Sequence, residues 1–379
     1  MAGSTFFRRA LTGLLLLAAV PAAASPSVLF DLSSGKVLAD KDAFMRWHPA
    51  SLTKLMTAYV TFRAIDAGEL QLDSPVKMTK HAAGEPPSKM GYKPGSVMTL
   101  DNALKMLIIK SANDVAMAIA ENVGGSEQAF VDRMNAEATR LGMSDTHFVN
   151  PNGLHDPDQY VSARDLGLLV MAIRKDYPQY APYFSIQGLS AGDKKLMNFN
   201  MLVGRFPGAD GMKTGFVCAS GFNLIGTATR DGRTLAVVVL GQTSAVARTD
   251  TAAALLERGF QMGDAEAKTL STLPYYGLRG GPPIDMRAEV CGKKPAAAQS
   301  EAAGDHEAKT VKSRWLEKLV NPKLVAVGLG GADGPVPLAR RNDNGAEYAD
   351  VPIPTPRPTD FQPVEAKADA RVKAAAGTN

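Results

Sequence analysis

The chain has 379 residues, of which 45% are hydrophobic and 21% are charged, and its formal net charge is +4. These proportions are ordinary for a globular protein, and the length allows one large domain with a second domain or a tail. A net charge this weak does not indicate a nucleic-acid-binding protein. The composition therefore favours a protein with a sizeable core and a slight preference for anionic surfaces.

The N-terminus has the pattern of an export signal. Arg8 and Arg9 precede an apolar run at residues 10–20, and residues 22–24 are all alanine. This order of charged, apolar and small residues is typical of a secretory signal peptide. The run is short for a membrane anchor, which needs about 20 residues. We therefore expect residues 1–24 to be removed on export.

The predicted elements follow from hydrophobic spacing and from turn residues. In chain order they are a hairpin of strands at 27–31 and 36–39, a helix from 49 to 62, helices between 100 and 140 broken near 110–113 and 124–125, a helix at 166–174, a hairpin of strands at 223–229 and 234–240, and a helix at 250–261. Serines at 126 and 162 are placed to cap two of these helices. We therefore expect one α/β unit with helices packed on an antiparallel sheet.

The composition changes in the last third of the chain. Residues 295–309 are rich in alanine and charge, and residues 351–363 are rich in proline. Only a short helix at 315–319 is suggested. We therefore expect a folded domain at 25–264 and a largely disordered C-terminal extension at 265–379.

The sequence contains neither a glycine-rich phosphate loop nor His, Cys and Asp residues at metal-ligand spacing, so we expect no cofactor. Its two cysteines, Cys218 and Cys291, provide too few ligands for a metal site. They form a disulfide if they lie close together in an oxidising compartment. The alternative is one buried thiol and one free thiol, and the sequence does not decide between the two.

A candidate nucleophile lies at the start of the first long helix. Ser51 and Lys54 are three residues apart, so they share a face of that helix. Serine needs a neighbouring base to become a nucleophile at neutral pH. Burial and a second cation nearby would favour the neutral amine of the lysine. The same spacing occurs twice elsewhere, both times in predicted turns, so the pattern alone is weak.

Two further groups of polar residues strengthen this hypothesis. Ser111 and Asn113 fall between two helices and can point into a cleft, although such a pair is more often a helix cap. Lys213, Thr214 and Gly215 lead into the strand region. There a lysine and a hydroxyl suit a substrate carboxylate, and a glycine lets a ligand approach the backbone. The three groups together predict a hydrolase with a serine nucleophile.

These motifs resemble those of penicillin-binding proteins and class A β-lactamases. The resemblance is closest to the low-molecular-mass penicillin-binding proteins that act as serine-type D-alanyl-D-alanine carboxypeptidases, and it extends over residues 27–262. Supporting stretches begin at Asp31, His48, Lys93, Asn152 and Tyr160. Ala112 stands where class A β-lactamases usually carry aspartate, and no glutamate occurs at 151–162. Both departures argue against a β-lactamase.

The resemblance implies a penicillin-binding protein fold, with an α-rich subdomain beside the sheet, and a role for each motif. Ser51 would attack the peptide bond between two D-alanines, Lys54 would take its proton, and Ser111 would relay that proton to the leaving amine. Asn113 would position Lys54 and the peptide. The implied substrate is a peptidoglycan stem peptide, and the implied inhibitors are β-lactams.

The remaining implied roles concern substrate binding. Lys213 and Thr214 would hold the terminal carboxylate, with Arg248 assisting from the turn after the last strand. Gly215 would let the substrate lie against the strand. Backbone N–H groups of Ser51 and Phe216 would form the oxyanion hole.

Two alternatives and one question of location stay open at this stage. The alternatives are a D,D-endopeptidase of the same fold and a non-catalytic scaffold that binds the cell wall. The signal implies a periplasmic protein. Well-studied family members add a β-rich domain and an amphipathic membrane helix, but residues 367–379 are too polar for such a helix. Membrane association is therefore undecided.

Overall fold

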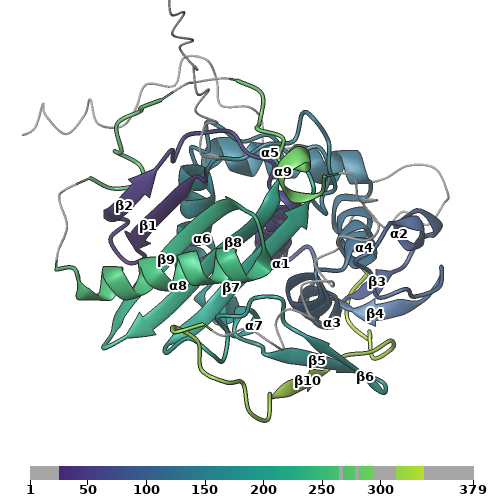
Figure 1. Cartoon of the computed structure of the whole chain (residues 1–379). Helices are drawn as coiled ribbons and strands as arrows, with labels where there is room; N and C mark the ends of the chain where they lie inside the picture. The colour runs from purple at the N-terminus through teal and green to yellow at the C-terminus, as the bar shows by residue number, and fades with distance from the viewer. Residues whose placement is uncertain (1–24, 264–267, 278–280, 293–312, 337–379) are drawn as a thin grey trace, which may run out of the picture.

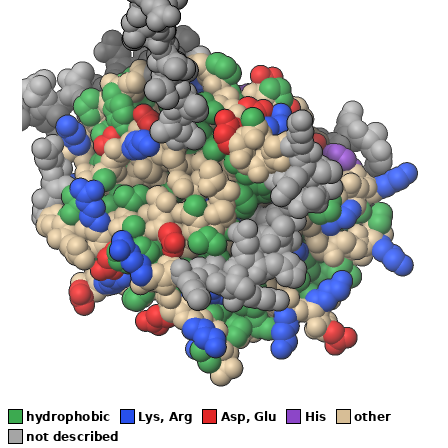
Figure 2. All heavy atoms as spheres, in the orientation of Figure 1, with side chains coloured by type: hydrophobic (Ala, Val, Ile, Leu, Met, Phe, Trp, Pro, Cys, Tyr) green, Lys and Arg blue, Asp and Glu red, His purple; other side chains and the backbone are tan. Residues whose placement is uncertain are grey.

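The computed structural model describes residues 25–263, 268–277, 281–292 and 313–336 (Figure 1). The expected signal peptide and the proline-rich stretch lie outside the described residues. Within these ranges, no helix combines the length and apolar character needed to cross a membrane. Figure 2 shows basic and acidic side chains spread over one face of the molecule.

A five-stranded antiparallel sheet organises the domain, with the order β2-β1-β9-β8-β7. Its strands are β1 (Ser27–Asp31), β2 (Val37–Lys41), β7 (Ala209–Val217), β8 (Gly221–Arg230) and β9 (Arg233–Gln242). Both predicted hairpins are confirmed. Because β7 is at the edge of the sheet, one side of its backbone is available to a ligand.

Helices cover both faces of this sheet. Figure 1 shows α8 (Ala245–Gln261) crossing in front of β8 and β9, while α6 (Ala163–Asp176) packs on the other face. Alternate residues of β9 enter different cores, as the pleat of a strand requires. Val237 and Val239 belong to the core beneath α8. Val238 belongs to the larger core that includes α1 and α4.

The α-rich subdomain follows the predicted order of elements. The remaining helices are η1 (Ala50–Thr53), α1 (Lys54–Asp66), α2 (Lys80–Gly84), α3 (Leu100–Lys105), η2 (Met106–Lys110), α4 (Asn113–Gly124), α5 (Glu127–Arg140), η3 (Pro178–Tyr180), α7 (Ala181–Phe184) and α9 (Arg287–Val290). Small sheets pair β3 (Pro75–Lys77) with β4 (Val97–Thr99), and β5 (Gly188–Ala191) with β6 (Lys194–Met197) and β10 (Leu324–Ala326). The predicted caps are confirmed, since the Ser126 and Ser162 hydroxyls accept backbone N–H bonds in the first turns of α5 and α6.

Two local predictions were wrong. Residues 315–319 form no helix; a segment of five residues is too short to be stable alone, and Trp315 packs against the core beneath α8 instead. Helix α8 begins at Ala245 rather than Asp250, because the Ser244 hydroxyl accepts the Ala247 N–H at 3.0 Å and caps the helix earlier. Arg248 therefore lies in the first turn of α8 and not on a turn after the last strand.

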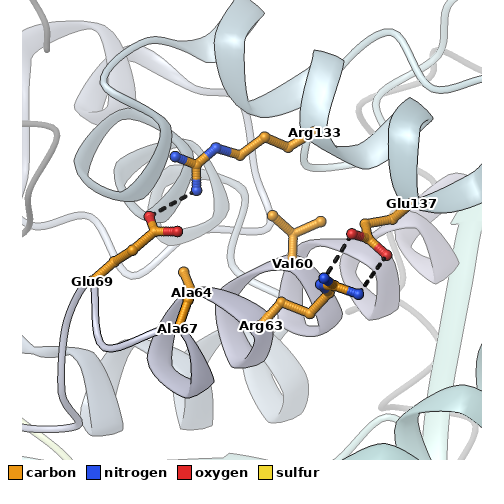
Figure 3. Close-up of a pocket in the computed structure, with 7 residues that line it drawn as sticks. All are labelled: Val60, Arg63, Ala64, Ala67, Glu69, Arg133 and Glu137. Carbon is orange, nitrogen blue, oxygen red and sulfur yellow. Dashed lines mark hydrogen bonds and ion pairs between the residues drawn. The ribbon is translucent and has the colours of Figure 1, made fainter. Parts of the chain in front are cut away.

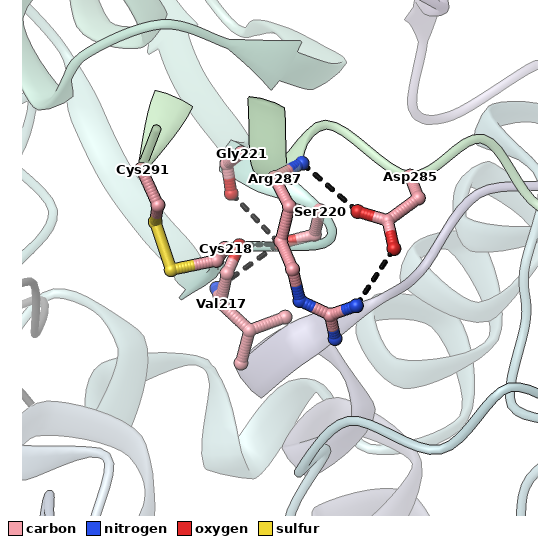
Figure 4. The surroundings of a disulfide bond; sticks show 7 residues. All are labelled: Val217, Cys218, Ser220, Gly221, Asp285, Arg287 and Cys291. Atoms are coloured by element: carbon pink, nitrogen blue, oxygen red, sulfur yellow. Dashed lines mark hydrogen bonds and ion pairs between the residues drawn. A yellow bond between two sulfur atoms is a disulfide. The ribbon is translucent and has the colours of Figure 1, made fainter. Parts of the chain in front are cut away.

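Described parts of the C-terminal extension pack against the domain. Strand β10 adds to β5 in parallel. Cys218 and Cys291 form a disulfide that joins the end of β7 to the segment around α9 (Figure 4). Where the structure describes it, the extension is therefore in contact with the folded domain.

Candidate active site

The predicted nucleophile and its lysine lie where a 3-10 turn becomes a helix. Ser51 is in η1 and half-buried, while Lys54 is the first residue of α1 and fully buried. The Lys54 amine lies 3.1 Å from the Ser51 hydroxyl. The spacing argument is thus confirmed in geometry, and Ser51 remains accessible while its partner is shielded from water.

Two further acceptors surround the Lys54 amine. Lys54 Nζ donates to the Asn113 side-chain oxygen at 2.7 Å and to the Asn152 carbonyl at 2.5 Å. Neither oxygen can donate a hydrogen bond. A neutral amine with both its protons on these oxygens presents its lone pair to Ser51, the partner that has a proton to give. The arrangement can therefore move the Ser51 proton to Lys54.

Ser111 and Lys213 form a second serine–lysine pair. Lys213 Nζ donates to the Ser111 hydroxyl at 2.9 Å and to the Thr214 carbonyl at 2.8 Å. Ser111 follows the π-turn η2 and has a left-handed backbone with a φ of 59°. Such turns and strained residues occur often at functional sites. Ser111 does not cap α4, whose N-cap is Ala112 without a side-chain bond.

Strand β7 lies directly against the nucleophile. A Cβ atom on Gly215 would fall 2.9 Å from the Ser51 backbone nitrogen, so only glycine permits this approach. Asn223 on β8 is opposite Gly215, and its amide donates to the His48 and Pro49 carbonyls at 3.0 and 3.2 Å. Asn223, which the sequence reasoning missed, thus ties the strand to the turn that carries Ser51.

The other substrate-binding candidates also lie on or beside β7. Thr214 and Phe216 are buried residues of the strand. Arg248 is 2% exposed, and its guanidinium donates to the Gly215 and Asn223 carbonyls at 3.3 and 3.2 Å. These two contacts of Arg248 support the backbone of β7 and β8. A contact between Arg248 and a substrate carboxylate stays a prediction.

Behind Lys54 lies a carboxyl group that the sequence reasoning also missed. Glu85 accepts the Asn152 side-chain amide at 2.8 Å, and the Asn152 carbonyl in turn accepts from Lys54. Burial raises the pKa of Glu85, although nearby His81 opposes the shift. Glu85 follows a short helix in a turn-rich stretch, so no periodic signal pointed to it. The supporting stretch that begins at Asn152 was the only sign in the sequence of its hydrogen-bond partner.

A pocket outside this cluster has a structural explanation (Figure 3). Its volume is about 110 Å³, and it is lined by Val60, Arg63, Ala64, Ala67, Glu69, Arg133 and Glu137. Arg133 pairs with Glu69 at 2.9 Å, and Arg63 pairs with Glu137 at 3.0 Å. None of the predicted site residues lines it; the Arg63–Glu137 pair links α1 to α5, and the Arg133–Glu69 pair links α5 to the turn after α1.

A serine beside a buried lysine, a second serine–lysine pair and an adjacent open strand define a serine hydrolase of the penicillin-binding class. Residues 17–244 match the Peptidase_S11 family, described as D-alanyl-D-alanine carboxypeptidase, and the chain belongs to this family. It is 36% identical over 241 residues to the D-alanyl-D-alanine carboxypeptidase DacC of Escherichia coli (strain K12), a match that covers 62% of this chain and 60% of the relative.

Solved structures agree with this assignment of family and fold. Penicillin-binding protein 6B from Escherichia coli has a TM-score of 0.60 and 35% identity, with 62% of this chain and 77% of that chain covered. Penicillin-binding protein D2 from Listeria monocytogenes, in its ampicillin-bound form, has a TM-score of 0.57 and 28% identity, with 62% and 96% covered. The first curated relatives are matched over only 60–62% of their own length.

Proposed function

We propose that the protein is a serine D-alanyl-D-alanine carboxypeptidase that removes the terminal D-alanine from peptidoglycan stem peptides through an acyl-enzyme on Ser51. The observation that carries this proposal is the position of the buried Lys54 amine, 3.1 Å from the Ser51 hydroxyl. Membership of the family supports the same reaction.

In the acylation step, the Ser51 oxygen attacks the carbonyl carbon of the penultimate D-alanine and passes its proton to Lys54. The N–H groups of Ser51 and Phe216 stabilise the oxyanion that forms, a contribution worth about 3–4 kcal/mol per donor. The contact between Gly215 and the Ser51 backbone supports this role, because it holds the two donors near one another.

Breakage of the C–N bond then requires a proton for the leaving amine. Lys213 donates to the Ser111 oxygen, so the hydroxyl proton of Ser111 is left to face the cleft. Ser111 gives that proton to the departing D-alanine and recovers one from the protonated Lys54, which leaves Lys54 neutral again. Water then attacks the ester, with Lys54 as its base, and releases the shortened peptide.

Recognition of a free terminal carboxylate distinguishes this reaction from that of the endopeptidase. Lys213 and Thr214 bind that carboxylate at the edge of β7, and Arg248 holds the strand in place. A carboxylate placed against a buried cation favours a substrate that ends at this point. The endopeptidase alternative needs room beyond the scissile bond, and the scaffold alternative leaves the two serine–lysine pairs unexplained.

The setting of the reaction is the periplasm, reached through the signal peptide at residues 1–24. The products shorten stem peptides and thereby affect wall growth and cell shape. β-Lactams inhibit the enzyme by acylating Ser51, in keeping with a relative solved in an ampicillin-bound form. Peripheral contact with the outer face of the cytoplasmic membrane is compatible with this placement.

The test is release of free D-alanine from a peptide that ends in D-Ala-D-Ala, measured for the parent and for Ser51→Ala. We expect release by the parent and none by the variant. Binding of peptidoglycan by both proteins without release of D-alanine would favour the scaffold. Cleavage of cross-linked dimers in preference to pentapeptides would favour the endopeptidase.

A further inference from the structure

A short segment after α2 supports the groups that surround the Lys54 amine. Residues 85–88, here named the brace, follow directly on α2. The Asn113 side-chain amide donates to the Pro86 carbonyl at 3.0 Å, and the Asn113 N–H donates to the Ser88 carbonyl at 2.7 Å. A carbonyl accepts only from the NH2 end of an amide, so the bond to Pro86 directs the oxygen of Asn113 to Lys54.

Glu85, the first residue of the brace, gives the corresponding support to Asn152. Its carboxylate accepts the Asn152 side-chain amide at 2.8 Å, and the Asn152 carbonyl accepts from Lys54 at 2.5 Å. The other end of the Asn152 side chain accepts the Leu154 N–H at 3.0 Å, so both ends are engaged. The Glu85 side chain is 11% exposed, and charges in such a place interact more strongly than they do in water.

The charge of Glu85 bears on the protonation of the catalytic lysine. A nearby anion stabilises the ammonium form of a lysine, whereas removal of the Ser51 proton needs the neutral amine. Lys213 on β7 carries a charge of the opposite sign, which favours the neutral amine. The pH at which Lys54 becomes a base therefore depends on an anion as well as on a cation.

Charged groups from several helices act on Glu85 itself. Burial raises the pKa of Glu85, His81 on α2 lowers it, and Glu127 on α5 raises it. The bond from the neighbouring amide and the charge of Lys54 on α1 also lower it. His81 lies 3.9 Å from the Glu85 carboxylate and 3.0 Å from that of Glu121 on α4, which packs beside α2 (Figure 1). The hydrogen bond to Glu121 raises the pKa of His81, so a cation favours ionised Glu85 from the side of the solvent.

We propose that Glu85 is a positioning residue for Lys54, which holds the Asn152 carbonyl on the amine and moves the loss of the amine's proton to higher pH. The inference rests on the acylation step of the proposed function. The two actions are separable, because the position depends on a hydrogen bond and the proton loss depends on a charge. Glu85 thereby makes the enzyme less active in acidic surroundings than its serine–lysine pairs alone would make it.

The experiment measures the rate constant of acylation by a fluorescent penicillin from about pH 5 to pH 10, in stopped-flow assays. The rate of the parent should rise to a plateau as Lys54 loses its proton. Glu85→Gln keeps the acceptor for Asn152 but has no charge, so it should reach half of its plateau about one pH unit lower. On the acidic side it should then be acylated about tenfold faster than the parent, with a plateau within about twofold of the parental one. Glu85→Ala should show the same shift and a plateau about tenfold lower, because it also releases the Asn152 side chain.

Glu69→Gln provides the matched control. It removes a carboxylate that is 23% exposed and pairs with Arg133 at 2.9 Å. Glu69 lies beyond the far end of α1, about 20 Å along the helix from Lys54. Both the midpoint and the plateau of its profile should therefore be parental.

A profile of Glu85→Gln that coincides with the parental one overturns the inference. A lower plateau without a shift overturns it as well, since a purely structural residue would have that effect. Release of D-alanine from a pentapeptide by the parent, measured at the plateau pH, tests the proposed function separately. Release together with coinciding profiles leaves the proposed function standing and refutes the role of Glu85. Absence of release overturns the proposed function, while the acylation profiles still confirm or refute the role of Glu85.

Discussion

Replacement of Gly153 by alanine tests whether the backbone behind the nucleophile sets the geometry of the site. Gly153 has a φ of +82°, and a Cβ atom there would lie 1.9 Å from the Ala50 carbonyl oxygen. Real Cβ atoms essentially never approach closer than 3.0 Å, so the two backbones must separate by about 1.1 Å. Because Ala50 precedes Ser51 and Asn152 precedes Gly153, the nucleophile and an acceptor of Lys54 both move.

A displacement of about 1 Å costs a reaction roughly 100-fold in rate. Gly153→Ala should therefore be acylated by a fluorescent penicillin about 100 times more slowly than the parent. Gly68→Ala is the control, since Gly68 has a similar φ of +73° but no neighbour within 4 Å of the added atom. Both variants lose about 1–2 kcal/mol of stability, because alanine is disfavoured in a left-handed backbone conformation. Only Gly153→Ala should be acylated more slowly. Parental acylation by a folded Gly153→Ala protein would refute the reasoning.

Three further predictions concern groups around the site. Lys54→Gln should lower the acylation rate by about 10²–10⁴-fold, the usual contribution of a general base, in stopped-flow assays with a penicillin. Burial raises the pKa of Glu85, so the folded parent loses stability as pH rises above about 4.5. Glu85→Gln should remove this loss in thermal melts between pH 4 and 8. At pH 4 the melting temperatures of the parent and of the variant should be alike. Burial alone would raise the pKa of Asp210, but bonds from Arg174 and Thr227 lower it. Ionised Asp210 therefore stabilises the folded protein at pH values above the pKa that its carboxyl has in the unfolded chain. This stabilisation is lost as the pH falls through the lower pKa of the folded protein. Asp210→Asn should lower the free energy of unfolding by about 2 kcal/mol at pH 7 and by much less at pH 3, as measured in denaturant titrations.

Much of the fold was predictable because its signals are local. Strand alternation, the turn at Gly232 and the serine caps of α5 and α6 depend on neighbours in sequence, and the structure bears them out. The start of α8 was missed because Ser244 was overlooked as its cap. The isolated segment at Trp315 has helical spacing, but its burial against α8 prevails over a weak local preference.

The site was predictable to a different degree for each residue. Ser51 and Lys54 are neighbours on one helical turn, so their contact follows from the helix itself. The resemblance gave Lys213 and Ser111 separate roles in one site, but it did not predict their direct contact, which joins residues 102 apart. Glu85 has no signal in the sequence, because its role depends on a carbonyl that comes from residue 152.

The disulfide is also a contact between residues that are far apart in the sequence. Two cysteines separated by 73 residues can pair only if the folded chain brings them together. Their pairing places the segment around α9 beside the end of β7, and composition alone could not predict that part of the C-terminal extension is held there.

The most direct test of the central claim is to locate the acyl group. The parent and Ser51→Ala are incubated with benzylpenicillin, and the adduct is mapped by mass spectrometry of the intact proteins and of their peptides. We predict one penicilloyl adduct on the parent, on the peptide that contains Ser51, and none on the variant. An adduct on another serine, or an equal adduct on Ser51→Ala, would contradict the assignment of Ser51 as the nucleophile.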